Sequence, residues 1–214
     1  SILNEKQLKS GGYGGIIGVG QGSANPPRLL HVTYNPAKAK KRFAFVGKGI
    51  TFDTGGLALK PAAGMEAMKA DMSGAAAVIA SVFAIAQLKL PIAVDGWAPL
   101  AENMVSDTAT RPSDVITIYG GKTVEVLNPD AEGRLVLADA LIKAAEVGKK
   151  AGGLDGIIDV ATLTGAATLG LGRQYAAMYT REKSVAKKLY EVGGKVGEKV
   201  WHMPLVDDYS VALT

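Results

Sequence analysis

Five apolar segments in the middle of this chain alternate between strand-like and helix-like patterns, and their order is the strongest constraint on its fold. Three are short apolar runs typical of buried strands, at residues 42–50, 92–100 and 156–165. Two longer stretches between them have helical patterns, at residues 73–90 and 135–147. This order predicts an α/β fold in which right-handed crossovers build a mixed, largely parallel sheet sandwiched between helices, a three-layer αβα architecture.

Local signals refine this prediction. The first helix is apolar nearly all round, and we expect Ser73 to cap its start and Pro91 to stop it. Two alternating runs meet at Gly120-Gly121, which is typical of a β-hairpin. The glycine-rich stretch 11–27 lacks the third glycine of a dinucleotide-binding fingerprint, and two prolines follow where the helix of that motif should begin.

Cysteine and histidine counts exclude several kinds of site. The 214 residues include no cysteine and only two histidines, His31 and His202, which are far apart in the sequence. A disulfide framework, a thiolate zinc site, a cysteine nucleophile and an HExxH zinc site are therefore excluded. Any metal ion must be held by carboxylates, carbonyl groups or amines.

Charge and hydropathy limit the partners. The formal net charge is +4, and Lys38, Lys40, Lys41 and Arg42 form a short basic cluster without interleaved aromatic residues. We therefore expect a solvated loop before a strand, and nucleic acid is not favoured as a partner. No uninterrupted apolar run reaches the roughly 18 residues needed to cross a bilayer, and no signal-peptide pattern opens the chain. These features predict a cytoplasmic protein without a membrane partner.

Charged residues collect where a parallel sheet places its ligands, in the loops beyond the carboxyl ends of the strands. Lys48 and Asp53 follow the first predicted strand, and Lys60 and Asp71 lie further along the same glycine-rich segment. Burying an isolated charge there would cost several kcal/mol, so each charge needs a partner. An ion-pair network between these lysines and carboxylates is one interpretation of this segment.

A second charged cluster lies directly before the second helix. Asp130, Glu132 and Arg134 occupy alternate positions there. Two carboxylates so close together suggest an acid–base couple of the glycosidase kind when the cluster is taken alone. Four carboxylates from three loops, however, would repel one another unless divalent cations lay among them. Two metal ions roughly 3.5–4 Å apart and bridged by carboxylates satisfy that arrangement.

Four motifs in this region are long and specific: "VGKGITFDTGG", "MKADMSGAAAV", "DAEGRLVLADAL" and "DVATLTGA". They closely resemble the catalytic domain of the leucyl aminopeptidases, the cytosol aminopeptidases that use two metal ions. The resemblance runs from about residue 41 to residue 214 and implies a zinc-peptidase-like fold. Residues 1–30 look like the family's lead-in segment, which leaves 31–214 as the catalytic domain. The resemblance also implies that the family's N-terminal domain is absent and that the catalytic domain is truncated at its C-terminal end.

The resemblance implies a set of metal ligands, residue by residue. The family's ligands fall on Lys48, Asp53, Asp71, Asp130 and Glu132. In the family pattern Asp53 and Glu132 bridge both ions. Lys48 and Asp71 complete the tighter site, whereas Asp130 serves the exchangeable one. Because a lysine can ligate only as the neutral amine, the ions must lower the pKa of Lys48.

The same resemblance implies a catalytic pair and a substrate pocket. Lys60 and Arg134 match the family's two catalytic residues. Lys60 would stabilise an oxyanion, and Arg134 would hold a bicarbonate ion that carries the proton. The expected nucleophile is a water that bridges the metal ions and is acidified by them. The residues expected to line the pocket, of which the apolar ones fit a packed core equally well, are Met68, Asn128, Thr162, Leu163 and Gly165.

Three positions depart from the family pattern. Pro129 stands where the family usually has threonine, directly before a predicted metal ligand. Proline fixes φ and removes one N–H group, so the loop would be strained if that group were needed. Val105 and Asp107 replace the family's usual proline and glycine, which leaves the structure of their loop less certain.

Together these features predict a metal-dependent aminopeptidase that removes N-terminal residues, preferably leucine and other apolar ones, from peptide substrates. The expected cofactors are two divalent metal ions, Mn or Zn with Mg as a further candidate, and bicarbonate. The full-length protein is expected to form a homo-hexamer. The alternatives are a catalytically inactive fragment and a DNA-binding or structural role of the same fold, for which the basic cluster is the only support.

Overall fold

The computed structural model describes residues 1–213. The chain divides into two compact units, Ser1–Thr162 and Leu163–Thr214. The first unit contains all five segments that dominate the sequence pattern, except for the last residues of the third predicted strand. That strand, β8, is shorter than predicted because it ends at Val160.

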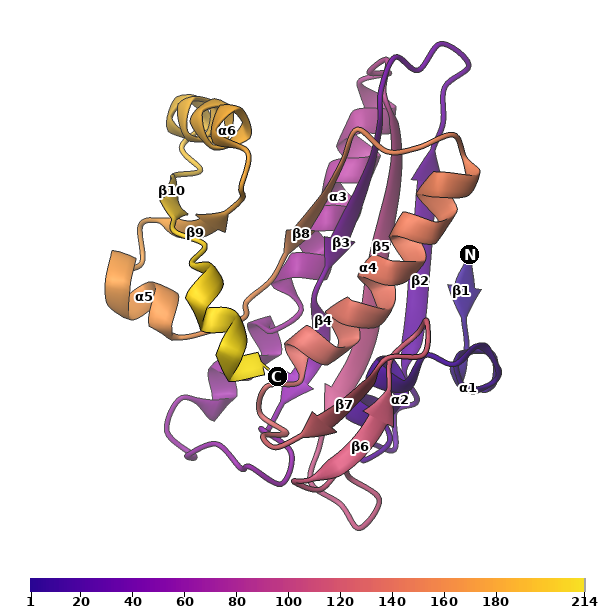
Figure 1. The fold of residues 1–214 in the computed structure, drawn as a ribbon, viewed down its shortest axis with the longest axis vertical. Helices are drawn as coiled ribbons and strands as arrows, with labels where there is room; N and C mark the ends of the chain where they lie inside the picture. Colours follow the sequence, from indigo (N-terminus) through magenta and orange to yellow (C-terminus); the bar gives the residue numbers. More distant parts are fainter. Residues whose placement is uncertain (214) are drawn as a thin grey trace. The chain divides into compact units, whose positions relative to one another are not determined.

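A six-stranded sheet forms the centre of the first unit (Figure 1). Its order is β1-β2-β5-β3-β8, and β4 pairs with a further part of β5. Parallel pairs join β3 to β5, β3 to β8 and β4 to β5, whereas β2 is antiparallel to β1 and β5. The predicted mixed, largely parallel sheet is thus confirmed. The strands are β1 (Ile2–Leu3), β2 (Arg28–Tyr34), β3 (Arg42–Gly47), β4 (Gly49–Asp53), β5 (Ala93–Asn103) and β8 (Gly156–Val160).

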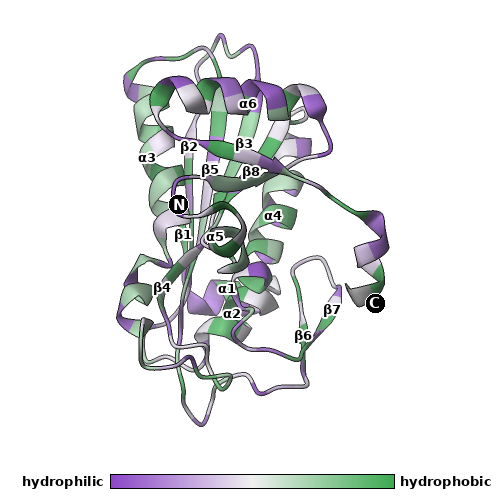
Figure 2. Cartoon of the chain, turned by 90° about the vertical axis from the view of Figure 1, so that its left-hand side faces the viewer, coloured by the Kyte–Doolittle hydropathy of each residue, from purple (hydrophilic) through white to green (hydrophobic). Residues whose placement is uncertain are grey.

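Helices cover both faces of this sheet (Figure 2). α3 (Ser73–Gln87) packs on one face, and α4 (Gly133–Lys150) packs on the other together with α2 (Gly14–Gly20). Neighbouring residues of β5 show the two faces, because successive side chains of a strand point in opposite directions. Trp97 belongs to the core cluster around α2 and α4, whereas a Cβ added at Gly96 would lie 2.8 Å from Val82 of α3. The three-layer prediction is therefore confirmed.

The glycine-rich stretch before the sheet forms a helix that the sequence pattern did not predict. α2 (Gly14–Gly20) follows the short α1 (Glu5–Gly11). A Cβ at Gly14 would lie 2.0 Å from the carbonyl oxygen of Thr117, and one at Gly15 would lie 2.2 Å from that of Leu135. Glycine lowers helix propensity, but here it permits contact between backbones that a larger residue would prevent.

The predicted hairpin at Gly120-Gly121 is confirmed. β6 (Asp114–Thr117) pairs antiparallel with β7 (Thr123–Val126) as a separate two-stranded sheet. Both glycines have positive φ angles, +93° and +96°. Glycine adopts this backbone region without the steric cost that a side chain would add.

Asp139 of α4 ties the hairpin and α2 together from within the core. Its two carboxylate oxygens accept the backbone N–H groups of Ile16 at 2.8 Å and of Tyr119 at 2.7 Å. Burial raises the pKa of Asp139 to about 6, although these hydrogen bonds favour the ionised form and oppose the change.

The ends of α3 differ from the prediction. Met72 is the N-cap in place of Ser73, whose hydroxyl donates to the carbonyl oxygen of Ala70 at 2.6 Å. The reason is that a 3-10 helix, η1 (Met65–Ala70), runs almost directly into α3, so Ser73 is already helical. At the other end the helix stops at Gln87 before proline is reached.

One stretch within residues 1–213, Met65–Gln87, is long and apolar enough to cross a membrane by length and composition. It contains Glu66, Lys69 and Asp71, so it includes no uninterrupted apolar run of 18 residues. The packing of α3 offers another reason for this composition, because Gly74, Ala75, Val78 and Val82 are buried against the sheet. A mostly buried core helix passes the same test of length and composition, but only 28% of the tested window is buried here.

The second unit is built from short elements around a parallel strand pair. β9 (Ala176–Tyr179) pairs with β10 (Val200–Met203), and α6 (Lys183–Val196) connects them. Trp201 makes edge-on contacts with the rings of Tyr175 and Tyr190. The remaining elements of this unit are α5 (Ala166–Leu171) and the 3-10 helix η2 (Asp207–Leu213).

Candidate metal centre

The five residues that the resemblance marks as metal ligands lie together at the carboxyl end of the parallel strands. One follows β3, one ends β4, one lies between η1 and α3, and two lie in the turn before α4. Carboxylate oxygens of Asp53, Asp130 and Glu132 lie within 4.8 Å of one another. The five residues are Lys48, Asp53, Asp71, Asp130 and Glu132.

Lys48 lies at the buried side of this cluster and is only 3% exposed. Its Nζ lies 2.8 Å from Asp71 Oδ2 and 2.8 Å from Glu132 Oε1, and it donates to the carbonyl oxygen of Thr162 at 2.9 Å. A Cβ at position 133 would lie 2.7 Å from Lys48 Cε. The glycine there therefore leaves the space that the lysine side chain occupies.

Lys60 lies at the more open side of the cluster. Its Nζ lies 2.9 Å from Asp53 Oδ2, and it also forms an ion pair with Asp130. Its backbone N–H donates to the carbonyl oxygen of Thr54 across the turn at Gly55-Gly56. Both glycines have positive φ, +87° and +61°, and this turn is what brings Lys60 back towards Asp53.

The lysines and carboxylates of the cluster face one another as ion pairs, which is compatible with both interpretations of these residues. The network is incomplete. Four carboxylates face two ammonium groups, which leaves a formal charge of −2 when all are ionised. Two oxygens, Asp71 Oδ2 and Glu132 Oε1, are buried and accept no hydrogen bond of good geometry from residues 1–213, although each faces Lys48.

These features fit divalent cations better than a finished structural network. An excess of carboxylates in a buried site is what a bound cation compensates. Oxygen ligands suit Mn²⁺ and Mg²⁺, whereas the lysine nitrogen favours Zn²⁺.

The pKa values in the cluster reflect this crowding. Burial alone would lower the pKa of Lys48, but the charges of Glu132 and Asp71 outweigh it and raise that pKa above the ordinary value. Burial raises the pKa of Glu132 and of Asp71, and the nearby charge of Asp53 adds to the increase in both. The two carboxylates are therefore poorly stabilised as anions in the metal-free protein.

Arg134 does not join the cluster of side chains. It lies in the first turn of α4 and is exposed, and its guanidinium makes no hydrogen bond or ion pair with the described part of the chain. An exposed, unpaired guanidinium two residues after Glu132 is free to bind an anion.

The expected pocket residues have different environments. Met68 is half-buried in η1, and Asn128 is exposed. Asn128 holds the ligand turn, because its Oδ1 accepts the N–H of Asp130 at 2.9 Å. The Thr162 hydroxyl donates to Asp71 Oδ1 at 2.7 Å. Leu163 and Gly165 belong to the second unit, so their placement at this centre stays a prediction.

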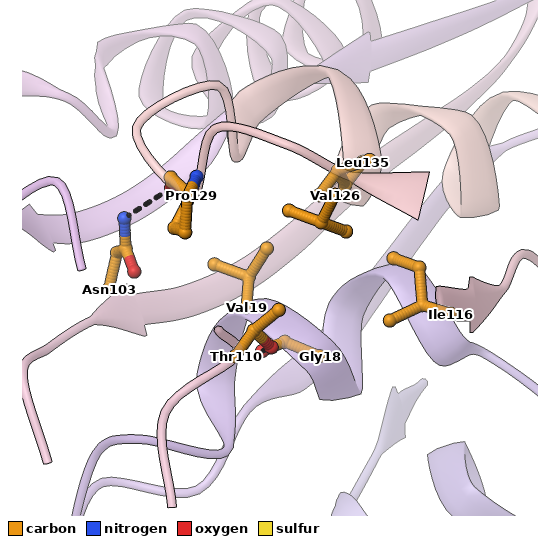
Figure 3. Close-up of a pocket in the computed structure, with 8 residues that line it drawn as sticks. All are labelled: Gly18, Val19, Asn103, Thr110, Ile116, Val126, Pro129 and Leu135. Atoms are coloured by element: carbon orange, nitrogen blue, oxygen red, sulfur yellow. Dashed lines mark hydrogen bonds between the residues drawn. The ribbon is translucent and has the colours of Figure 1, made fainter. Parts of the chain in front are cut away.

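Asn103, the last residue of β5, is a contributor that the sequence pattern did not single out. Its side-chain Nδ2 donates to Asp53 Oδ1 at 2.9 Å. It also donates to the carbonyl oxygen of Pro129 at 3.1 Å (Figure 3). The available signal was its position at the carboxyl end of a predicted buried strand, where a lone amide among apolar residues needs partners.

Pro129 lies buried behind the ligand turn. With Asn103 it borders a cavity of about 10 Å³ whose other walls include Val19, Ile116 and Leu135 (Figure 3). This volume is at the lower limit for one water molecule, and the lining is mostly apolar. The cavity is therefore a packing void behind the cluster and does not form a substrate site.

Comparisons with known proteins agree with this geometry. The family model for the catalytic domain of the cytosol aminopeptidase family matches residues 1–214. A "Probable cytosol aminopeptidase" of Streptomyces avermitilis is 57% identical over 204 residues, which cover 95% of this chain and 39% of that protein. One of Leifsonia xyli is 55% identical over 207 residues, covering 97% of this chain and 40% of that protein.

A solved structure is also similar. The bottromycin maturation enzyme BotP, determined in complex with Mn, superposes with a TM-score of 0.94 at 41% identity. The match covers 100% of this chain and 46% of that one. The chain thus spans about two fifths of the length of the curated relatives it matches. Because the model of that family's catalytic domain covers all of its residues, the chain belongs to the cytosol aminopeptidase family.

Proposed function

We propose that this chain carries the metal centre of an aminopeptidase that hydrolyses the N-terminal residue of peptides. One observation supports this most directly. Four carboxylates converge at the carboxyl end of the sheet around only two ammonium groups, and the buried oxygens Asp71 Oδ2 and Glu132 Oε1 share the single ammonium group of Lys48. The names of the relatives and the Mn complex of BotP support the same conclusion.

Two divalent ions would be held by the five residues of the cluster, with Mn and Zn as the leading candidates and Mg as a third. Asp53 and Glu132 would bridge the ions, Lys48 and Asp71 would complete one site, and Asp130 would complete the other. When bound, such ions supply an acidified water as nucleophile and an anchor for the free amino group of the substrate.

Lys60 would act on the developing oxyanion. In the metal-free protein its ammonium group is held by Asp53 and Asp130. Once cations neutralise these carboxylates, Lys60 can turn its N–H donors towards the substrate oxygen that becomes negatively charged. A donor aimed at that oxygen contributes to the rate only in the transition state.

Arg134 would hold a bicarbonate ion as the proton carrier. Its guanidinium is exposed and can bind a planar anion through two parallel hydrogen bonds. Neither histidine lies near the cluster in the sequence, so this anion would take over the transfer of protons that a histidine often performs.

The finer features of the function follow the same proposal. Leucine and other apolar residues would be the preferred N-terminal side chains, in a pocket formed by Met68, Asn128, Thr162, Leu163 and Gly165. The full-length protein would act in the cytosol as a homo-hexamer. The relatives are named as peptidases, which does not favour an inactive or DNA-binding role.

Hydrolysis of leucine amide in the presence of Mn²⁺ tests this proposal. Asp130→Ala and Glu132→Ala each remove a predicted ligand and should abolish turnover. Glu191→Ala removes an exposed carboxylate of α6 and serves as the matched control, which should keep wild-type activity. Full activity in both ligand variants would reject the proposed metal centre.

A further inference from the structure

The two loops that carry most of the predicted ligands are joined through one buried side chain. Asn103 is 5% exposed and ends β5, between the turn at 53–56 and the turn at 128–132. Its Nδ2 donates to Asp53 Oδ1 in the first turn. The same group donates to the Pro129 carbonyl in the second turn (Figure 3). Each turn thereby receives one hydrogen bond from the same amide group.

The backbone of Asn103 strengthens the link to the first turn. Its carbonyl oxygen accepts the N–H of Thr54 at 3.0 Å and the Thr54 hydroxyl at 2.9 Å. Gly56 passes so close that an added Cβ would lie 2.9 Å from Asn103 Oδ1. The side chain is therefore confined on the side of the first turn, and its amide group has little freedom to rotate.

Asp53 is oriented by this contact. Its Oδ1 accepts N–H groups from Asn103 and from Gly55, both at 2.9 Å, whereas its Oδ2 faces Lys60. The hydrogen bonds to Oδ1 fix the plane of the carboxylate, and this leaves Oδ2 directed into the cluster. Groups that hydrogen-bond to a ligating carboxylate fix its orientation and tune its affinity for the metal.

Only a neutral group with two N–H donors suits this position. Both partners, a carboxylate oxygen and a carbonyl oxygen, are acceptors. The NH2 group of the Asn103 amide must therefore face them, and its oxygen must point away. Leucine has a similar shape but cannot donate. It would leave the Pro129 carbonyl unpaired and Asp53 with one donor fewer.

We propose that Asn103 is a positioning residue that sets the spacing between Asp53 and the Asp130–Glu132 pair, and so tunes the affinity of the metal centre. The inference rests on the proposed function. It also explains why proline is compatible with position 129, because the contact uses the backbone carbonyl group of that residue, which proline retains. The missing N–H is not required for this link, and the neighbouring N–H of Asp130 is held by Asn128.

The test is a calorimetric titration of the protein with Mn²⁺, together with thermal unfolding in the presence of a chelator. Asn103→Leu should weaken Mn²⁺ binding by roughly 10- to 100-fold, the usual effect of losing a partner that orients a metal ligand. Thr110→Val is the matched control. Thr110 borders the same cavity, but its hydroxyl donates to Gly18, away from the ligands. Both variants should unfold at a lower temperature, whereas Thr110→Val should bind Mn²⁺ as the wild type does.

The outcomes separate the two proposals. Wild-type Mn²⁺ affinity in a folded Asn103→Leu variant would overturn the positioning role while leaving the metal centre intact. Absence of Mn²⁺ binding by the wild-type protein would overturn the proposed function and this inference with it. If Asn103→Leu does not fold, Asn103→Ser replaces it in the test. Serine retains one donor, but its side chain is too short to reach both Asp53 and the Pro129 carbonyl. The Mn²⁺ affinity of this variant should then fall, and unchanged affinity would reject the role.

Discussion

Replacing Lys48 with methionine removes the ammonium group that lies 2.8 Å from both Asp71 Oδ2 and Glu132 Oε1. The methionine side chain is nearly the same length, so the change isolates the charge. Both oxygens are buried, and Lys48 is the only partner that faces them within residues 1–213. Breaking a buried ion pair by removing one partner costs about 3–5 kcal/mol, because an uncompensated charge remains.

That cost converts into a large shift of the unfolding temperature. For a chain of this size, about 1 kcal/mol corresponds to roughly 2–4 °C, so the metal-free variant should unfold about 6–20 °C below the wild type. The assay is thermal unfolding at pH 7 with a chelator present. Lys150→Met is the control, since it removes an exposed ion pair with Glu146 that contributes about 0–1 kcal/mol.

The pH dependence provides a second check on the same variant. Burial raises the pKa of Asp71 and of Glu132 above their unfolded values. Such groups favour the folded state more as the pH falls, because the folded protein then holds the protons more tightly. Protonation removes the charges that Lys48→Met leaves uncompensated, so the gap between this variant and the wild type should shrink as the pH is lowered from 7. An equal unfolding temperature for both proteins at pH 7 would refute this account of the cluster.

Two further predictions concern the scaffold. Gly74→Ala would place Cβ 2.0 Å from the carbonyl oxygen of Val160 and should destabilise the protein by at least about 1–3 kcal/mol, as measured by chemical denaturation. Gly194→Ala is the control, because a Cβ at this position of α6 would meet open space. It should be neutral or stabilise the protein by up to about 1 kcal/mol. The second prediction concerns Asp139, whose pKa is raised to about 6 by burial. The protonated form of this side chain therefore stabilises the folded state below about pH 4, and this contribution is lost as the pH rises towards 6. The loss is about 3 kcal/mol for a difference of about two pH units; Asp139→Asn should lack this slope, and an identical pH profile in the variant would contradict the assignment.

Much of the first unit could be predicted from the sequence because its signals are local. Apolar runs, helical periodicity and the Gly120-Gly121 pair predicted β3, β5, β8, α3, α4 and the hairpin without knowledge of tertiary contacts, whereas β1, β2 and the separate strand β4 were not predicted. The positions of the charged residues at strand ends then predicted where they would converge. The rule that sites lie beyond the carboxyl ends of parallel strands supplied the link between sequence and space.

The features that were missed depend on contacts between distant segments. α2 is helical although it is rich in glycine, because Gly14 and Gly15 pack against backbone groups more than 100 residues away in the sequence. The role of Asn103 likewise depends on two turns that meet only in the fold. The N-cap of α3 was predicted at Ser73, one residue after the observed Met72. The sequence pattern did not reveal η1, which runs into the start of α3.

The structure also changes the question that Pro129 poses. From the sequence, the missing N–H before Asp130 suggested strain in the ligand loop. In the structure the loop is held by a carbonyl group of residue 129 and by the side chain of Asn128, both of which remain available. The hydrogen bonds that hold the loop are therefore compatible with proline at this position.

A diffraction experiment on crystals grown with Mn²⁺ tests the central claim most directly, because anomalous scattering locates the metal without any assumption about activity. The account predicts two anomalous peaks per chain, roughly 3.5–4 Å apart, among Lys48, Asp53, Asp71, Asp130 and Glu132. A map with no peak among these five residues, and with Lys48 still paired to Asp71 and Glu132, would contradict it.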